Sequence, residues 1–368
     1  MESDVILVLV VGAALAFDFT NGFHDTANVV ATSISTRAIP PRTAVTIAAL
    51  LNFAGAFISL KVAATVGQGL VDSRAITTTT VFAGLIGAIT WNLATWYFGL
   101  PSSSSHALLG GVIGAAFFAQ GADAVNRSGV VDKLLVPALV SPTLAFVAAG
   151  LSVLVAYRIV GRERPGAVRR GFRVSQVMSG SLLALSHGTN DGQKTMGIIT
   201  LALVAHGDVS AAHFHVPEWV VISAATAIAA GTYAGGWRII NTVGNRIHKM
   251  DTAQGFAAQG AGAAVILAAS HYGFPISTTH STSGAVMGAG AAKRLSAVRW
   301  GVAGNIVLAW AITLPAAAGM AGLVYGFSRL FGTGALGPLI VSVLAVGFIA
   351  ALFARRARTG PPVAAPAE

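Results

Sequence analysis

Apolar runs long enough to cross a membrane follow one another along nearly the whole sequence. A membrane-spanning helix needs about 20 mostly apolar residues, and about eleven runs approach that length. Because lipid offers the backbone no hydrogen bonds, such runs predict an all-α polytopic membrane protein. The runs lie at 3–36, 43–66, 79–99, 102–120, 134–157, 176–205, 217–237, 253–272, 275–291, 300–325 and 334–354.

The composition supports this assignment, because only 10% of the 368 residues are charged and 54% are hydrophobic. In a soluble domain roughly a quarter of the residues are charged. The net charge of +10 does not indicate nucleic-acid binding, since the basic residues lie between apolar runs, as in cytoplasmic loops. The absence of cysteine excludes disulfides and thiolate metal sites. Glu2 and Asp4 stand where a cleavable signal peptide would be basic.

The basic clusters also predict the orientation of the chain in the membrane. All of them fall on one side if every apolar run crosses, and cytoplasmic loops are the ones enriched in Lys and Arg. We therefore expect a multi-pass protein of the cell membrane, with the N-terminus outside and the C-terminus inside. The clusters are Arg158, Arg162, Arg164, Arg169, Arg170 and Arg173; Arg238, Arg246 and Lys249; Lys293, Arg294 and Arg299; and Arg355, Arg356 and Arg358.

One short motif occurs twice, at 99–106 and 273–280. In each copy a proline is followed by a row of Ser or Thr residues, a histidine and a run of small residues. Two matched copies are unlike the isolated Ser/Thr clusters that serve as contacts between membrane helices. The identical pairs are Gly99/Gly273, Pro101/Pro275, Ser103/Ser277, His106/His280, Gly110/Gly284, Val112/Val286, Gly114/Gly288 and Ala115/Ala289.

The predicted orientation gives the two halves that carry this motif opposite topology, which is an inverted repeat. An alternative arrangement has 7 spans plus re-entrant hairpins at 79–120 and 253–291, and it preserves the inversion. We expect a first repeat at 1–157, a cytoplasmic basic loop at 158–175, a second repeat at 176–325, a final membrane helix at 326–358 and a disordered tail at 359–368.

Three acidic residues lie inside apolar runs, namely Asp18, Asp25 and Asp191. A carboxylate within the hydrocarbon is costly and indicates a functional site. Asp25 and Asp191 lie in the polar, Gly-containing segments 20–28 and 186–194, which predict two broken helices that line a cavity. Asp18 has no acidic counterpart in the second half, so its role stays open between function and structure.

The hydroxyl rows and the carboxylates predict two kinds of ligand. Helix starts that carry Ser and Thr present unpaired backbone N–H groups, which suit an oxyanion. Carboxylates beside Asn and Thr oxygens suit sodium or a proton, which would offset repulsion between the aspartates and the anion. The predicted anion ligands are Ser103, Ser104, Ser105, Ser277, Thr278 and Thr279, and the predicted cation ligands are Asp25, Asn28, Asp191 and Asn190.

At these motifs the sequence resembles the inorganic phosphate transporter (PiT) family of cation-coupled phosphate permeases. The matching segments are Asn21–Asn28 and His187–Gly197, together with both hydroxyl motifs. The resemblance implies phosphate between the two hydroxyl motifs and a coupling cation, H⁺ or Na⁺, on the aspartates. It further implies a symporter that imports phosphate by alternating access, free or as a neutral metal–phosphate complex, without enzymatic activity or a cofactor.

The sequence departs from the family pattern at two places. Gly192-Gln193-Lys194 replaces an ending like Ala27-Asn28, so that Lys194 could act as a fixed cation, and Gln259 stands where an acidic residue is expected. Thr26, Gln193 and Lys194 are candidates for additional site residues.

Two other functions remain open from the sequence. A divalent-metal carrier would use His and Asp residues as ligands, although no metal site can be assigned firmly. A serine hydrolase is disfavoured, because the second hydroxyl row would have no purpose in it. A homodimer is also left open. The candidate metal ligands are His24, Asp25, His187, Asp191, His106 and His280.

Overall fold

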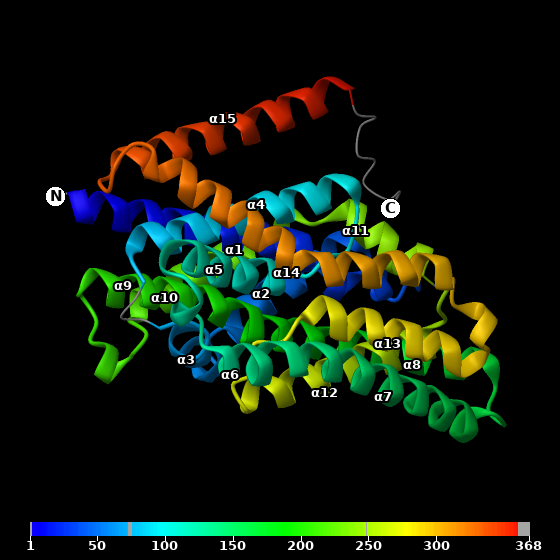
Figure 1. Cartoon of the computed structure of the whole chain (residues 1–368). Helices are drawn as coiled ribbons and strands as arrows, with labels where there is room; N and C mark the ends of the chain where they lie inside the picture. Colours follow the sequence, from blue (N-terminus) through cyan, green and yellow to red (C-terminus); the bar gives the residue numbers. More distant parts are fainter. Residues whose placement is uncertain (1, 73–75, 248, 360–368) are drawn as a thin grey trace.

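The computed structural model describes residues 2–72, 76–247 and 249–359. Over these residues the chain is helical, without β-strands apart from a single bridge between Val71 and Val125, which confirms the all-α class. Figure 1 shows long helices lying side by side, with the N-terminus at one end of the bundle and α15 turning back from the end of α14 and diverging from it.

Most of the helices match the apolar runs of the sequence. Three π-helical turns join or extend them, at Val131–Leu135, Gly188–Gly192 and Thr242–Arg246. The α-helices are α1 (Glu2–Ser35), α2 (Pro41–Gly55), α3 (Lys61–Gln68), α4 (Thr78–Phe98), α5 (Ser104–Gln120), α6 (Arg127–Val130), α7 (Val136–Val160), α8 (Pro165–His187), α9 (Gln193–His206), α10 (Glu218–Ala234), α11 (Trp237–Asn241), α12 (Thr252–His271), α13 (Thr278–Lys293), α14 (Trp300–Arg329) and α15 (Leu336–Thr359).

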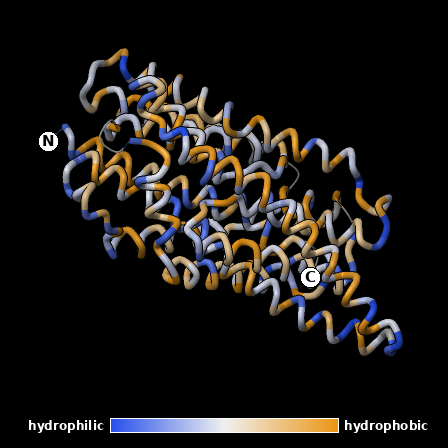
Figure 2. Tube along the Cα trace, turned by 60° about the horizontal axis from the view of Figure 1, so that its bottom comes forward, coloured by the Kyte–Doolittle hydropathy of each residue, from blue (hydrophilic) through white to orange (hydrophobic). Residues whose placement is uncertain are grey.

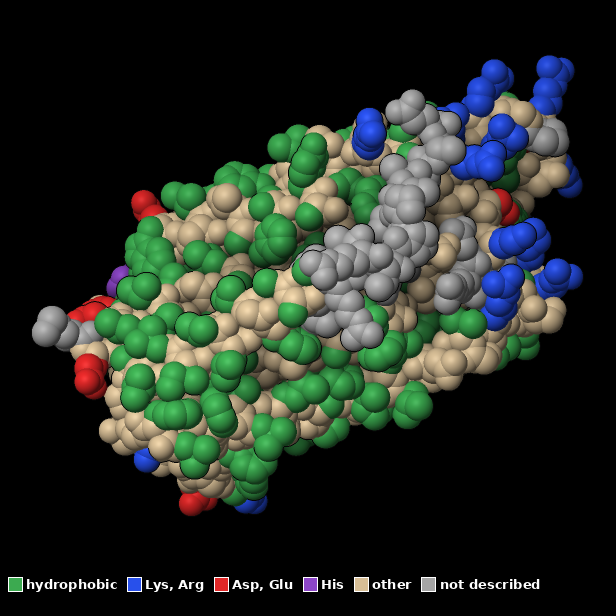
Figure 3. Space-filling view, turned by 90° about the horizontal axis from the view of Figure 1, so that it is seen from above, with side chains coloured by type: hydrophobic (Ala, Val, Ile, Leu, Met, Phe, Trp, Pro, Cys, Tyr) green, Lys and Arg blue, Asp and Glu red, His purple; other side chains and the backbone are tan. Residues whose placement is uncertain are grey.

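The surface has the character of a membrane protein. By length and composition, four described helical stretches can each cross a bilayer, namely Glu2–Ser35, Thr78–Phe98, Arg127–Val160 and Trp300–Arg329. On the face drawn in Figure 3, hydrophobic side chains cover the middle, Lys and Arg gather at one end, and acidic residues lie mainly at the other. Figure 2 likewise shows hydrophobic residues along the helices and hydrophilic stretches at both ends.

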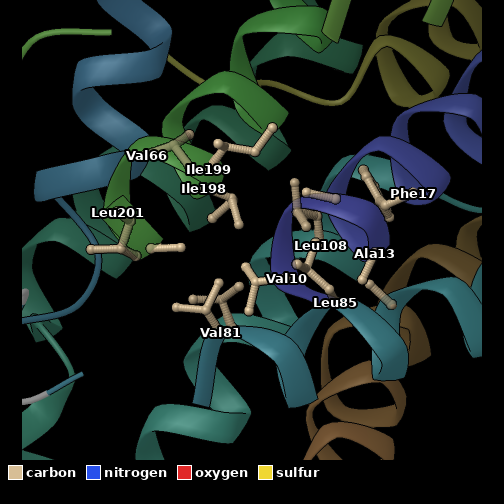
Figure 4. Packing of buried hydrophobic residues seen from close by; sticks show 14 of the residues in the cluster. Val10, Ala13, Phe17, Val66, Val81, Leu85, Leu108, Ile198, Ile199 and Leu201 are labelled. Atoms are coloured by element: carbon tan, nitrogen blue, oxygen red, sulfur yellow. The ribbon is translucent and has the colours of Figure 1, made fainter. Parts of the chain in front are cut away.

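Helix α1 runs through the interior and packs against α4, α9 and α10. Figure 4 shows part of the apolar core, in which Val10 of α1 belongs to one cluster with side chains of four other helices. These are Val66, Leu85, Leu108 and Ile199, all of them buried. Within a bilayer such packing is stabilised by van der Waals contact. It holds the pair α4–α5 against the middle of α1.

Glycines bring helix backbones into direct contact at related positions of the two halves. A Cβ atom at Gly22 would lie 2.3 Å from the carbonyl oxygen of Ile228, so α1 and α10 touch there. A Cβ atom at Gly188 would lie 2.1 Å from the carbonyl oxygen of Asn52 on α2. Only glycine permits these approaches, which set the positions of Asp25 and Asp191, each three residues further on.

The two broken helices that we expected are not found. Helix α1 continues without interruption through 20–28, and the second segment contains a π-helical turn rather than a break. The polar side chains are accommodated within the helix itself, since Thr20 donates to the carbonyl of Phe17 and Thr26 to that of Gly22, at 2.7 and 2.6 Å. Neighbouring helices cover the segment, so its polar side chains do not face lipid and the helix can stay continuous.

Several predicted boundaries also differ from the structure. The basic loop at 158–175 is mostly helical, because α7 ends at Val160 and α8 begins at Pro165. Arginine side chains can be solvated from a helix that extends beyond the apolar layer, so a basic segment need not be a loop. Run 43–66 is divided between α2 and α3, and α14 extends to Arg329, into the predicted final helix. The predicted tail lies outside the described residues from 360 onwards.

Candidate functional site

Two sharp turns place the hydroxyl rows at the starts of helices α5 and α13. Gly99 and Gly273 end the preceding helical stretches with φ values of 67° and 77°, which favour glycine. Ser103 then accepts a hydrogen bond from the backbone N–H of His106 at 3.0 Å, and Ser277 accepts one from that of His280 at 3.2 Å. Both serines are N-caps, as their position after proline predicts.

Asp25 of α1 is buried against both hydroxyl rows. Ser104 donates a hydrogen bond to its Oδ2 atom, and the Thr279 hydroxyl donates to Oδ1 at 3.3 Å. His24 Nδ1 lies 2.8 Å from the same Oδ1. Asn28, one turn further along α1, donates from its amide to the Thr279 hydroxyl at 2.8 Å. The carboxylate of Asp25 therefore joins residues from three separate helices.

Asp191 lies in the π-helical turn between α8 and α9 and has a comparable setting. Thr278 donates a hydrogen bond to its Oδ2 at 2.9 Å, and His187 Nε2 lies 3.2 Å from that oxygen. The Lys194 ammonium donates to Oδ1 of Asp191, and also to Ser105 Oγ and the Ile276 carbonyl oxygen, both at 2.7 Å. This buried partner is a lysine, whereas the ring beside Asp25 is that of His24, and this distinguishes the two sites.

The two halves contribute matching contacts to one site. In each half of the sequence, the aspartate accepts from a hydroxyl of the Ser/Thr row in the same half, Ser104 or Thr278. The residue three positions later donates to the Ser/Thr row of the other half, from Asn28 to Thr279 and from Lys194 to Ser105. Thus the predicted anion and cation ligands, which lie far apart in the sequence, come together in the interior.

The predicted asparagines offer free acceptor atoms beside the aspartates. Asn190 donates from its amide to Ser270 Oγ at 2.8 Å and to the Phe274 carbonyl oxygen at 3.1 Å, at the turn between α12 and α13. The Oδ1 atoms of Asn28 and Asn190 are buried and have no hydrogen-bond partner within the described part of the chain. Such oxygens suit a cation.

Two further candidates are bonded away from the aspartates. Thr26 donates to the carbonyl oxygens of Gly22 and Thr232, at 2.6 and 3.1 Å. Gln193 accepts from the backbone N–H of Val62 at 2.9 Å and donates to the Thr189 carbonyl oxygen at 2.5 Å. The contacts of both side chains hold helices together.

The four histidines predicted as metal ligands fall into two groups. Asp25, His187 and Asp191 each contribute one potential ligand atom, and these three atoms lie within 4.8 Å of one another, a spacing that a metal ion can bridge. His106 and His280 instead pack edge to face, with ring centroids 4.5 Å apart. His280 also stacks on Trp310. The six predicted metal ligands are thus divided between the carboxylate site and an adjoining ring cluster.

The structure adds Asn52, which the sequence motifs did not indicate, and it shows the partners of Gln259, which the sequence had marked as a departure from the family pattern. The Oδ1 atom of Asn52 on α2 lies 3.1 Å from Nδ1 of His187, and the amide nitrogen of Asn52 donates to the Thr232 hydroxyl at 2.8 Å. Gln259 donates to Ser33 at 2.8 Å and to the Val29 carbonyl oxygen at 3.0 Å. Asn52 could have been found from the sequence as a single amide side chain inside the apolar run 43–66.

Comparison with known proteins places the chain among transport proteins rather than enzymes. A family profile described as "Phosphate transporter family" matches residues 21–321. A probable low-affinity inorganic phosphate transporter of Mycobacterium bovis is 50% identical over 327 residues, covering 89% of this chain and 78% of the relative. One of Bacillus subtilis is 42% identical over 323 residues, covering 87% and 96%.

A solved structure described as "The sodium-dependent phosphate transporter" superposes with a TM-score of 0.78 at 26% identity, covering 88% of this chain and 99% of that one. A relative from Rhizobium meliloti, named a probable low-affinity inorganic phosphate transporter, is 50% identical over 321 residues, covering 87% of this chain and 96% of that protein. The profile match extends over most of the chain, as do these relatives. The chain is therefore a membrane protein of the phosphate transporter family.

Proposed function

We propose that this protein is a secondary symporter that imports inorganic phosphate together with a monovalent cation, H⁺ or Na⁺, by alternating access. The observation that carries the proposal is the convergence of two hydroxyl-bearing helix starts on two buried aspartates. This arrangement offers hydroxyl donors and positive helix ends to an anion, and carboxylate oxygens to a cation. The family membership and the sodium-dependent phosphate transporter among its structural neighbours support it.

Phosphate would bind between the starts of α5 and α13. The hydroxyls of Ser104, Ser105, Thr278 and Thr279 lie here, and they now contact Asp25, Asp191, Asn28 or Lys194. A hydroxyl hydrogen can rotate from one acceptor to another, so the same groups can donate to phosphate oxygens. Ser103 and Ser277 contribute mainly by capping the two helices.

The coupling cation would bind at Asp25, with the unpartnered Oδ1 of Asn28 as a further ligand. Asp191 already has the Lys194 ammonium beside it, so the corresponding place in the second half holds a fixed positive charge. We infer that the two aspartates are unequal, and that Asp25 carries the exchangeable ion. The Oδ1 atom of Asn190 remains available to a cation that accompanies phosphate.

Coupling would follow from charge neutralisation. An anion brought alone into a buried site that contains carboxylates is repelled, and an isolated charge in a low-dielectric interior is strongly disfavoured. A cation on Asp25 lowers both penalties. The fully loaded and fully empty sites would therefore reorient readily, whereas the half-loaded site would not.

We also propose the inverted repeat with halves 1–157 and 176–325, in which α4–α5 and α12–α13 are re-entrant hairpins whose turns meet at the site. Support comes from the matched helix contacts at Gly22 and Gly188 and from the reciprocal contacts of Asn28 and Lys194. The gathering of basic side chains at one end of the molecule supports a plasma-membrane orientation with the N-terminus outside (Figure 3).

The test is radiolabelled phosphate uptake into proteoliposomes with the sodium and proton gradients imposed separately. We expect uptake in the parent to follow one gradient and Asp25→Asn to lose this dependence. Asp132→Asn, which changes an exposed carboxylate, serves as the matched control and should transport like the parent. If the variants with Asp25→Asn and Asp191→Asn both transported like the parent under the same gradient, the proposed coupling would be refuted.

A divalent-metal carrier is the second candidate, favoured by the close approach of Asp25, His187 and Asp191. The same cluster would accommodate a metal that enters bound to phosphate. Uptake of labelled magnesium or manganese in phosphate-free buffer would support the metal carrier. Metal uptake that requires phosphate would instead indicate a metal–phosphate complex as the substrate.

A further inference from the structure

Asp18 is a buried carboxylate that the proposed phosphate site does not use. It lies on α1, seven residues before Asp25, which is two helical turns or about 10 Å along the axis. Its side chain is 0% exposed, and neither carboxylate oxygen has a hydrogen-bond partner among the residues that the structure describes. An ionised carboxylate in this state is strongly disfavoured, so Asp18 must be neutralised, either by a proton or by a bound cation.

Two other oxygen-bearing side chains lie beside Asp18. They are Asn21, one turn further along α1, and Thr195 of α9, the helix that packs against α1. The Oδ1 atom of Asn21 and the Oγ1 atom of Thr195 are likewise buried and without a hydrogen-bond partner in the described ranges. Four buried oxygens without a hydrogen-bond partner in the described ranges thus belong to Asp18 and to two side chains that adjoin it.

The ammonium of Lys194 does not provide the missing charge. It neighbours Asp18, but an ammonium has three N–H donors. All three are directed to Asp191, to Ser105 Oγ and to the Ile276 carbonyl oxygen. The Lys194 ammonium therefore pairs with Asp191 and has no N–H donor left for Asp18.

We propose that Asp18, Asn21 and Thr195 form a further binding site for a monovalent metal cation of the size of sodium. Oxygen ligands of this kind suit a hard cation, which several oxygens can coordinate at once. A single proton would form a hydrogen bond between only two of the four oxygens. One carboxylate balances one positive charge, which favours a monovalent ion over a divalent one.

The position of this site gives it a role distinct from the site at Asp25. Asp18 is nearer than Asp25 to the N-terminal end of α1, the end that we place outside. A cation there would occupy the entrance side of the phosphate site and reduce its negative charge before phosphate arrives. This role in transport rests on the proposed function, whereas the binding of the cation does not.

The test is binding of ²²Na⁺ to the purified full-length protein in detergent, without phosphate and without a gradient. Asp25→Asn is the background, because it removes the other proposed cation site. We expect this protein to bind one sodium ion, displaced by unlabelled sodium but not by choline. Adding Asp18→Asn should abolish the binding, and adding Asp132→Asn, an exposed carboxylate, should leave it unchanged.

A milder variant covers the case in which the Asp18 change prevents folding. Thr195→Val keeps the shape of the side chain and removes one ligand, so sodium affinity should fall about tenfold, the factor for one interaction of ordinary strength. The proposal is overturned if Asp25→Asn protein binds no sodium, or if Asp18→Asn and Thr195→Val both leave its affinity unchanged. Because no transport is measured, loss of phosphate uptake would overturn the proposed function and not this site.

Discussion

Replacing Lys194 by methionine should strongly destabilise the protein, although methionine fills a similar volume. The Lys194 side chain is 2% exposed and its partner Asp191 is 0% exposed. The substitution removes the ammonium and leaves the carboxylate of Asp191 buried without a counter-ion. Breaking a buried ion pair from one side costs about 3–5 kcal/mol, whereas a surface pair contributes about 1 kcal/mol or less.

The three contacts of the ammonium support the same estimate. It donates to Asp191, to the hydroxyl of Ser105 and to a backbone carbonyl oxygen. Hydrogen bonds that involve a charged group contribute about 1.5–3 kcal/mol each, so the loss of two or more of them falls in the same range. We expect Lys194→Met to lower the free energy of unfolding by about 4 kcal/mol.

The double variant Lys194→Met/Asp191→Asn distinguishes the cost of an uncompensated charge from general damage to packing. Because asparagine leaves no buried charge, the double variant should regain at least about 2 kcal/mol over Lys194→Met. Equilibrium unfolding in mixed SDS and dodecylmaltoside micelles, followed by tryptophan fluorescence, would measure both values. If the double variant were as unstable as the sum of the single variants, the ion pair would not have the energetic role that its burial indicates.

Two further predictions test the geometry of the bundle and of the site. Gly22→Ala should lower the free energy of unfolding by about 1–3 kcal/mol, because its Cβ atom would lie 2.3 Å from the carbonyl oxygen of Ile228. The control Gly12→Ala should leave this free energy unchanged, because a Cβ atom there meets nothing within 4 Å. Equal unfolding midpoints for the two variants would contradict the close contact at Gly22. Ser104→Ala should raise the KM for phosphate about tenfold through the loss of one donor, and Ser128→Ala, an exposed serine, is the control in the same uptake assay.

Much of the site followed from local patterns in the sequence. Ser103 and Ser277 cap helices because a hydroxyl after proline can satisfy the unpaired N–H groups of a helix start, which is a local property. The expected cost of burying Asp25 and Asp191 in an apolar run likewise marked them as site residues. The grouping of these residues around one centre followed from the repetition of the motif.

Other features depended on partners that are distant in the sequence. The polar content of 20–28 predicted a broken helix, yet α1 is continuous because other helices bury its polar residues. Asn190 and Gln193 were selected by proximity to Asp191, but their amide nitrogens are directed to the turn between α12 and α13 and to a backbone carbonyl. Local pattern does not show the direction of a side chain within a packed bundle.

The sequence by itself determined that the chain is a helical membrane protein with two matched hydroxyl motifs, because hydrophobic length and helix capping are local properties. The tertiary structure decided which charges compensate one another. Lys194 reaches Ser105 across 89 positions of sequence, and Asn28 reaches Thr279 across 251. Only the packed helices, therefore, show that Asp191 has a fixed counter-ion while Asp18 has none within the described residues.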